Sequence, residues 1–423
     1  MKMLFRIGVV TALAASLFIT SCTKESSVSE VDYANTQLYQ IMQSYYLWYD
    51  HVPKVNPSDF SNPSVLMDSL RYKALDRYSF VMSYNEYVSY FQQGVYVGYG
   101  ISLAFDDQNN LRLAYIFDDS PLKAAGATRG WIINSINGTT PTSGNLSSLL
   151  GPATEGYSAT FAMTDLNGVS HQGDFAKKQV AMNTVLAKKI LNIGGERVGY
   201  LSFYSFIDNS VAELDSAFKY FEENSITKLV VDLRYNGGGL TNVATQLASE
   251  IIGNGNSSNV FYRFVNNNLH SNLDSTVYFE NRSYAASGLT SVAFITTANT
   301  ASSSELVING LKPYMNVKLV GSTTYGKPVG MYIFFDKNYS YAFFPICFST
   351  QNSLGVGDYY SGIPVDIAAA DDLAKDFGDP TEDSMAKALQ ALGVSTTRGN
   401  SVTAPSVQRV LPNGAFGVIL GSY

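Results

Sequence analysis

The chain has 423 residues, which is enough for large cores and for two to four domains. Its 28 Lys and Arg residues face 35 Asp and Glu residues, so the net charge is −7 and the pI is about 5.1. This balance lacks the basic footprint of a nucleic-acid-binding protein and excludes that class. Charged residues make up only 15% of the sequence, whereas Tyr, Phe, Asn and Ser are plentiful, which indicates a globular envelope protein with a weakly charged surface.

The first residues carry a targeting signal. Two basic residues precede an apolar run over residues 7–20, which is too short to cross a bilayer as a mature helix. The run leads into Ile-Thr-Ser-Cys, which resembles the cleavage box of bacterial lipoproteins and implies lipidation of Cys22. We therefore expect a signal peptide over residues 1–21, a lipidated tether over residues 22–31, and anchoring in the bacterial cell envelope, facing the periplasm or the surface. An ordinary signal peptide with an incidental cysteine is the alternative.

Cysteine and histidine usage argues against metal and disulfide chemistry. The second of two cysteines, Cys347, lies in the apolar run 341–348, which is typical of a buried, inert thiol. No disulfide framework or Cys-based zinc site is predicted. None of the three histidines shows metal-ligand spacing, and a Ser-His-Asp triad is an alternative without support from the sequence. We predict structural or surface roles for His51, His171 and His270.

Residues 32–90 are predicted to form a helical N-terminal region. Apolar side chains recur at near-helical spacing from Leu38 to Trp48, and Pro53 ends the segment. A second helix is predicted over residues 64–71. The many aromatic side chains of this region are interpreted as core.

From residue 91 the pattern changes to short strands separated by turns. Strands are expected over residues 98–105 and 111–116, and again near 157–165 and 171–178. The region 91–178 resembles a bacterial PDZ domain. The resemblance implies that it binds an extended chain end by strand addition and that a loop captures the terminal carboxylate. The residues that would form this loop are Tyr99, Gly100 and Ile101. A PDZ-shaped module that binds nothing is the alternative.

Residues 179–372 are predicted to form the catalytic core. Strands over residues 197–203 and 228–234 alternate with helices over 211–221 and 240–252, which indicates parallel βαβ crossovers. The fold class is therefore α/β in the core and α+β for the multidomain chain. Ligands of such sheets bind at the carboxyl ends of the strands.

Three segments of this core suggest catalysis. Ser302 lies between an apolar strand and a helix, where free backbone N–H groups and the helix dipole favour negative charge. A glycine-rich turn, Gly237-Gly238-Gly239, follows the strand that ends near Asp232. Lys327 lies between a glycine and a proline. Together they suggest a nucleophile, an oxyanion hole and a base.

Each segment also has a simpler interpretation. Ser302 and Glu305 have the spacing of a helix capping box. The glycines alone fit a flexible turn. The residues before Lys327 nearly spell a phosphate-binding loop, but Pro328 follows the lysine and a strand follows Pro328, so we reject nucleotide binding.

The order of the motifs adds specificity. Asp-Leu-Arg-x-Asn-x-Gly-Gly begins at Asp232, Ser-x-Ser-Glu begins at Ser302, and Thr-Tyr-Gly-Lys ends at Lys327. This series resembles the carboxyl-terminal processing (tail-specific) serine peptidases. The resemblance implies a crotonase-like core, a Ser302 nucleophile, a Lys327 base, and an oxyanion hole made by the N–H groups of Gly238 and Ser303. It implies no metal and no organic cofactor.

A lysine base must be neutral, although its ordinary pKa is about 10.4. Apolar neighbours such as Val329 and Ile333 are expected to lower this pKa by burial. Many relatives carry Gln four residues after the lysine, where this chain has Met331. The orienting partner of the amine is therefore open, with Ser304 as a candidate, and Glu305 is assigned to helix capping.

Two later segments complete the prediction. An Asn-rich insertion over residues 253–289 is expected to cover or border the active site. Residues 361–366 resemble the closing strand of the core. The segment 373–423 contains an amphipathic helix over residues 381–392 and a tail that either adds an edge strand or stays mobile.

The sequence thus predicts a lipid-anchored envelope serine endopeptidase with a Ser302/Lys327 dyad. Its partners are polypeptide substrates with accessible C-terminal ends, recognised through the PDZ-like domain. Two alternatives come from other classes: a binding protein on the same fold that has lost catalysis, and an envelope scaffold that captures chain ends for another protease.

Overall fold

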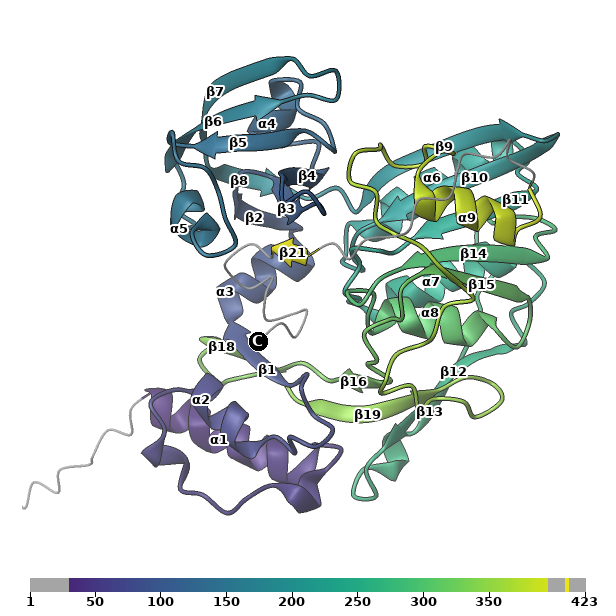
Figure 1. The fold of residues 1–423 in the computed structure, drawn as a ribbon. Helices are drawn as coiled ribbons and strands as arrows, with labels where there is room; N and C mark the ends of the chain where they lie inside the picture. Colours follow the sequence, from purple (N-terminus) through teal and green to yellow (C-terminus); the bar gives the residue numbers. More distant parts are fainter. Residues whose placement is uncertain (1–29, 395–407, 411–423) are drawn as a thin grey trace, which may run out of the picture.

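The computed structural model describes residues 30–394 and 408–410. Predictions that fall before residue 30, including lipidation of Cys22, lie outside the described residues. Within the described ranges, no helix is both long enough and apolar enough to cross a membrane. Figure 1 shows a helical N-terminal region, a β-rich region, and a large sheet covered by helices.

The N-terminal region contains the two predicted helices, α1 (Glu30–Ser44) and α2 (Pro63–Leu70). The helix α2 begins where Pro63 occupies the first turn and the Asn62 side chain accepts bonds from two backbone N–H groups. A short strand, β1 (Phe80–Ser83), pairs with β18 (Tyr341–Phe344). This pairing joins the N-terminal region to a strand from the C-terminal half of the chain.

The β-rich region matches the predicted strands. Its sheet has the order β21-β3-β4-β5-β6-β7. The elements are β2 (Val95–Gly98), β3 (Ile101–Phe105), β4 (Leu111–Ile116), α4 (Pro121–Ala124), β5 (Ile132–Ile136), α5 (Leu146–Leu150), β6 (Ser158–Thr164), β7 (Ser170–Ala176), β8 (Lys178–Ala181) and β21 (Gln408–Val410). The strands enclose a separate apolar core that includes Leu113, Ile136 and Phe161. Residues from the end of the chain therefore belong to this sheet.

The large sheet has the order β20-β15-β14-β11-β10-β9. Its strands are β9 (Val185–Ile193), β10 (Glu196–Phe203), β11 (Lys228–Asp232), β14 (Ser291–Thr296), β15 (Asn316–Gly321) and β20 (Ile367–Ala368). All neighbours from β10 to β20 are parallel, as the βαβ pattern predicts, and β9 is antiparallel at the edge. The prediction of a closing strand over residues 361–366 is wrong, because β20 begins at residue 367.

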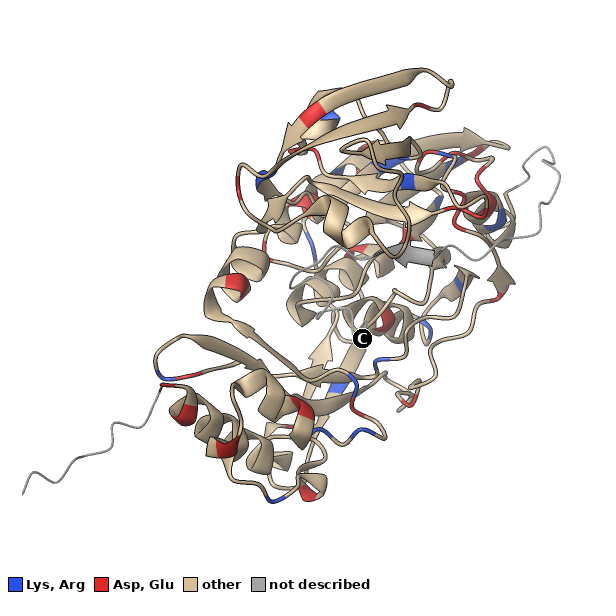
Figure 2. Ribbon diagram, turned by 60° about the vertical axis from the view of Figure 1, so that its left-hand side comes forward, with Lys and Arg blue, Asp and Glu red and all other residues tan. Residues whose placement is uncertain are grey.

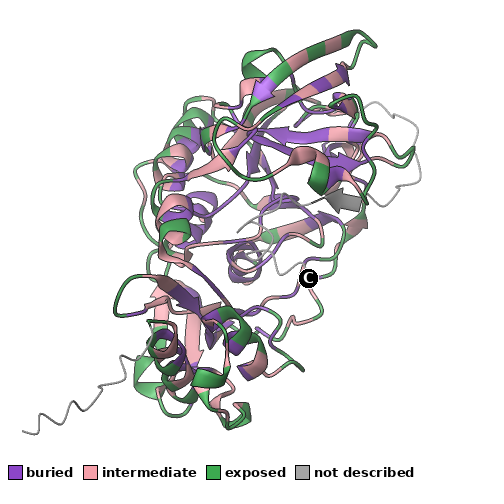
Figure 3. Cartoon of the chain, turned by 90° about the vertical axis from the view of Figure 1, so that its left-hand side faces the viewer, coloured by how far each residue is buried: buried purple, intermediate pink, exposed green. Residues whose placement is uncertain are grey.

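Helices cover both faces of this sheet. The helices α6 (Ser210–Glu223), α7 (Thr241–Ile252) and α8 (Ser303–Leu311) pack on one face, against side chains such as Phe294. The helix α9 (Asp383–Ala391) packs on the other face, where Met385 meets Ala293. Because both faces are covered, the central strands β10, β11 and β14 are buried over most of their length, whereas the edge strands β9 and β20 are not. Buried residues are purple in Figure 3. The helix predicted over residues 381–392 begins two residues later, and Glu382 caps α9.

A further sheet, of order β13-β12-β19-β16, borders the site. It contains β12 (Val260–Asn266), β13 (Ser275–Tyr278), β16 (Val329–Met331) and β19 (Ile346–Gln351), and β17 (Phe334–Phe335) pairs with β18 nearby. The insertion supplies β12 and β13. Asn267 Nδ2 donates hydrogen bonds to the carbonyls of Ser44 and Tyr46. The insertion is therefore packed against the N-terminal region.

Candidate active site

Ser302 lies at the junction of β14 and α8, as predicted. Its backbone has φ 56° and ψ −116°, a conformation that non-glycine residues rarely adopt. Such strain costs on the order of 1–3 kcal/mol and persists only where the surroundings enforce it. The turn places the serine at the carboxyl end of a central parallel strand, next to the first N–H groups of a helix.

Ser302 and Lys327 line the same cavity, which has a volume of about 290 Å³. The other wall residues are mostly apolar. They are Phe80, Phe91, Gly237, Gly239, Leu240, Thr241, Asn242, Phe264, Gly330, Met331, Tyr332, Ile333, Phe344 and Phe348. Because Phe264 comes from β12, the insertion borders this cavity, which was one of the two predicted arrangements.

The Glu305 carboxylate joins the two predicted catalytic segments. Its Oε2 accepts hydrogen bonds from the backbone N–H of Ser302 (2.9 Å) and of Lys327 (2.8 Å). Its Oε1 accepts from the Gly326 N–H (2.7 Å) and the Thr324 hydroxyl (2.5 Å). The helix-capping role is confirmed by the bond to Ser302, but the carboxylate also holds the lysine segment. Four donors converge on this buried group, while burial raises its pKa above the usual range.

The Lys327 amine is suited to act as a base. Burial lowers its pKa to about 8, whereas the negative charges of Asp76 and Glu305 act in the opposite direction. The predicted effect of apolar surroundings is therefore confirmed in direction. A substantial fraction of this amine is neutral at slightly alkaline pH.

The amine has a different neighbour from the one predicted. Lys327 Nζ lies 3.7 Å from Met331 Sδ, and 5.8 Å from the centre of the Tyr78 ring. The hydroxyl of Ser304, the suggested orienting partner, instead donates to the Asn236 carbonyl (3.1 Å). The sulfur of Met331 therefore lies beside the amine, from the position four residues after the lysine.

The glycine-rich turn lies directly against the serine. A Cβ atom on Gly238, which has φ +98°, would come within 2.7 Å of Ser302 Cβ and 2.9 Å of Ser303 N. Only glycine fits this close approach. The Gly238 N–H, however, donates to Asn236 Oδ1 (2.8 Å), so this predicted oxyanion donor is occupied in the structure. The Ser303 N–H stands at the first position of α8, where no acceptor exists within the helix.

Further hydrogen bonds fasten the turn to the serine segment. The Asn236 carbonyl accepts from the Ala301 N–H (3.1 Å), and the Ser303 hydroxyl donates to the Gly239 carbonyl (2.7 Å). The turn and the start of α8 therefore form one connected unit.

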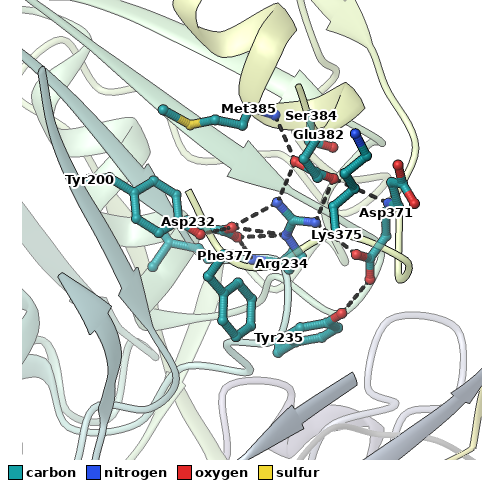
Figure 4. A network of polar contacts seen from close by, with 12 residues as sticks. Tyr200, Asp232, Arg234, Tyr235, Asp371, Lys375, Phe377, Glu382, Ser384 and Met385 are labelled. Atoms are coloured by element: carbon teal, nitrogen blue, oxygen red, sulfur yellow. Dashed lines mark hydrogen bonds and ion pairs between the residues drawn. The ribbon is translucent and has the colours of Figure 1, made fainter. Parts of the chain in front are cut away.

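A buried ionic cluster holds the residues that directly precede the glycine turn (Figure 4). Arg234 contacts Asp232 (2.8 Å), Asp371 (2.7 Å) and Glu382 (3.0 Å). Arg129, from the β-rich region, contacts Asp371 (2.6 Å). Neither Asp232 nor Arg234 lines the cavity. The neighbouring arginines hold the pKa of Asp371 well below its usual range despite its burial.

The N-terminal region supports the lysine, which the sequence did not predict. The Tyr78 hydroxyl donates to the Gly326 carbonyl, and Arg77 donates to the Tyr325 carbonyl (2.7 Å). Asp76 fixes this turn by accepting from the Tyr78 N–H (2.8 Å). The signal that could have found this support is the segment Asp-Arg-Tyr-Ser-Phe over residues 76–80.

None of the three histidines lines the cavity, in agreement with the prediction. His51 stacks on Tyr72, His171 on Trp131, and His270 on Tyr45. Acidic and basic residues are interspersed along the ribbon in the view of Figure 2. Within the described ranges, no group of three His, Cys, Asp or Glu residues could hold a metal ion.

The predicted carboxylate-binding loop is tightly packed. Tyr99 and Ile101 are buried, and the Ser120 hydroxyl donates to the Tyr99 carbonyl (2.7 Å). The Gly100 N–H bonds the Tyr96 hydroxyl, and the Gly100 carbonyl accepts from the Phe117 N–H. In this structure the Gly100 amide is therefore occupied.

Comparison with known proteins identifies the class of protein to which this fold and site correspond. Residues 197–341 match the model of peptidase family S41, and residues 33–80 match the peptidase S41 N-terminal domain. The chain therefore contains domains of peptidase family S41, the carboxyl-terminal processing peptidases.

Curated relatives agree with this assignment. The chain is 24% identical over 332 residues to a probable CtpA-like serine protease of Staphylococcus aureus (strain MRSA252), covering 76% of this chain and 62% of that protein. It is also 24% identical over 267 residues to a probable CtpA-like serine protease of Staphylococcus epidermidis, covering 62% and 52%. The chain thus spans less than two thirds of the length of these relatives.

Solved structures support the fold. A putative S41 protease from Bacteroides fragilis has a TM-score of 0.70 at 22% identity, covering 84% of this chain and 97% of that one. A photosystem II D1 C-terminal processing protease has a TM-score of 0.50 at 16% identity, covering 82% and 94%. This likeness establishes a mixed α/β fold of several sheets and helices.

Proposed function

We propose that this chain is a serine endopeptidase in which Ser302 is the nucleophile and Lys327 is the general base. The observation that carries the proposal is the single Glu305 oxygen that binds the backbone N–H of both residues, beside a cavity that both side chains line. The amine has a pKa of about 8, so it can accept a proton near neutral pH.

The mechanism follows from this arrangement. Neutral Lys327 removes the Ser302 hydroxyl proton as the oxygen attacks the peptide carbonyl. The C–N bond then breaks, and the ammonium returns the proton to the leaving amine. Water hydrolyses the acyl-enzyme, with Lys327 again as base, which restores free Ser302.

The oxyanion requires backbone donors. The Ser303 N–H is one candidate, and the Gly238 N–H becomes a second when the substrate carbonyl replaces Asn236 Oδ1 as its acceptor. One such donor is worth roughly 3–4 kcal/mol of transition-state stabilisation. Substrate binding is thus proposed to complete the site.

The finer parts of the proposal concern the substrate and the location. The core is proposed to be crotonase-like, and residues 91–178 to be a PDZ-like domain that recognises the C-terminal ends of polypeptides. Cys22 is proposed to carry a lipid that anchors the protein in the bacterial cell envelope. The apolar cavity beside Ser302 is consistent with uncharged peptide segments as substrates.

One alternative has an observation in its favour. The occupied Gly238 N–H and the Met331 sulfur beside the amine also suit a peptide-binding protein that has lost catalysis on the same fold. Purified protein starting at residue 23 and an unstructured polypeptide substrate separate the two functions. The enzyme should cleave the substrate, and Ser302→Ala and Lys327→Ala should not. Binding without cleavage by the unsubstituted protein would establish the alternative.

A further inference from the structure

The edge of the β-rich sheet holds a strand from the far end of the chain. The strand β21 pairs with β3 in antiparallel register, with Gln408 opposite Phe105, Arg409 opposite Ala104 and Val410 opposite Leu103. Figure 1 shows β21 beside β3, away from the helix α9 that precedes it in the sequence. Among the described strands of this sheet, β3 has only β4 as its other neighbour.

This edge is suited to bind an extended backbone. A strand at a sheet edge presents a row of unpaired N–H and carbonyl groups, which is a template for another chain. Recognition by strand addition uses these main-chain groups for affinity. The structure thus shows the edge of β3 already paired with a backbone segment of the same chain.

The direction of β21 matches that of an incoming chain end. As β21 runs from residue 408 to 410, its partners on β3 run from 105 to 103, toward the turn at Gly100. An extended polypeptide that replaced β21 in this register would also point its C-terminal end toward that turn. The two would therefore compete for the same backbone groups.

The sequence favours a short strand at this place. Pro405 and Pro412 bracket residues 406–411, and proline lacks the N–H that a ladder needs. The thirteen residues 395–407 link the core to β21 and can reach at most about 45 Å. In the structure the segment that these residues tether pairs with β3 of the same chain.

We propose that the edge of β3 is a strand-acceptor site that the chain fills with its own segment Gln408–Val410, which an extended polypeptide must displace to bind there. The inference rests on the strand pairing and not on Ser302 or Lys327. Under the proposed function, this segment would restrain substrate capture.

The experiment uses the full chain in the Ser302→Ala background, so that proteolysis plays no part. Gln408→Pro and Arg409→Pro are compared, because neighbouring N–H groups of a strand point in opposite directions and only one of them faces β3. Hydrogen exchange is measured over residues 101–105. The variant that removes the inward N–H should exchange there on the order of tenfold faster, and the other variant should stay closer to the Ser302→Ala parent.

A peptide provides the second readout. The probe is a fluorescein-labelled, amidated peptide of residues 403–415, which carries no terminal carboxylate. It should bind the exchange-sensitive variant and restore protection of residues 101–105, whereas the parent needs about millimolar peptide because the tethered segment competes. Unchanged exchange in both variants together with no peptide binding would overturn the proposal, and so would protection that depends on protein concentration. Absence of polypeptide cleavage by the unsubstituted protein, with these exchange differences intact, would overturn only the proposed function.

Discussion

Two buried carboxylate clusters flank the glycine turn and the serine, and they differ in whether cations contact the carboxylates. In one cluster, Arg129 and Arg234 bind the carboxylates of Asp232, Asp371 and Glu382. In the other, Glu305 binds four uncharged donors, and no Lys or Arg among the described residues forms an ion pair with it. The first cluster holds the loop by ion pairs, with two guanidinium groups facing three carboxylates. The second leaves a negative charge whose field reaches Lys327 and raises its pKa against the effect of burial.

The comparison separates two tasks. Charges that are paired with ions of opposite sign can fix a strand end without changing the chemistry of the cavity. A lone buried carboxylate fixes the geometry of Ser302 and Lys327 and also tunes the base. Substitutions in the two clusters should therefore have different consequences, which the following predictions use.

The largest effect on stability is expected at Arg234. Arg234→Met leaves Asp232 and Glu382 buried without this cation, and removal of one partner of a buried ion pair costs about 3–5 kcal/mol. The free energy of unfolding in urea measures the loss. The control is Arg197→Met on an exposed side chain, which should stay within about 0.5 kcal/mol. Equal losses in the two variants would contradict the role of the cluster.

Glu305→Gln should affect both stability and chemistry. The glutamine NH₂ group would face the N–H and O–H donors that surround the Glu305 carboxylate, which should cost about 1–3 kcal/mol of stability. Cleavage should also fall, because the Ser302 and Lys327 backbone N–H groups lose their common acceptor. Loss of the negative charge should lower the Lys327 pKa further, so residual activity should extend to lower pH.

Glu250→Gln is the matched control for Glu305→Gln. Burial raises the pKa of Glu250 to about 9, so this carboxyl is already neutral at pH 7 and the amide replaces it with little change. Urea unfolding and the pH dependence of cleavage should separate the two variants. A similar pH profile for both would contradict the electrostatic role of Glu305.

Gly238→Ala tests the close approach of the turn to the serine. The new Cβ would collide with Ser302 Cβ at 2.7 Å and with the Ala301 carbonyl at 2.8 Å. We expect a stability loss of about 1–3 kcal/mol and loss of cleavage. Gly255→Ala is the control, because Gly255 also has a positive φ, of 91°, but has open space around it. Cleavage that survives Gly238→Ala as it survives Gly255→Ala would exclude the turn from the site.

The sequence predicted the parts of this site that depend on local pattern. The strand-to-helix turn at Ser302, the parallel core strands and the lowered pKa of Lys327 follow from apolar runs, turn residues and apolar neighbours. Tertiary contacts decided the rest. Tyr78 supports the lysine across about 250 positions of sequence, and Arg129 meets Asp371 across a similar interval. The Asn236 side chain occupies the Gly238 N–H, which no spacing rule reveals.

The smallest expected effect is a pH shift at Met331. In Met331→Gln an amide oxygen can accept a hydrogen bond from the Lys327 ammonium, which favours the charged form and raises the amine pKa. Cleavage should then require a higher pH, by a few tenths to about one unit. Met331→Leu keeps the apolar contact and should leave the midpoint of the pH profile near that of the unsubstituted protein. A shift to lower pH in Met331→Gln would contradict this account.

The central claim is a neutral lysine that activates Ser302, and the pH dependence of polypeptide cleavage tests it most directly. The rate should rise with pH and reach half its maximum near pH 8, because the amine becomes neutral as the pH passes its pKa of about 8. Lys327→Ala should abolish cleavage, and with it the rise of the rate with pH. Undiminished cleavage by Lys327→Ala, with an unchanged pH profile, would contradict the account.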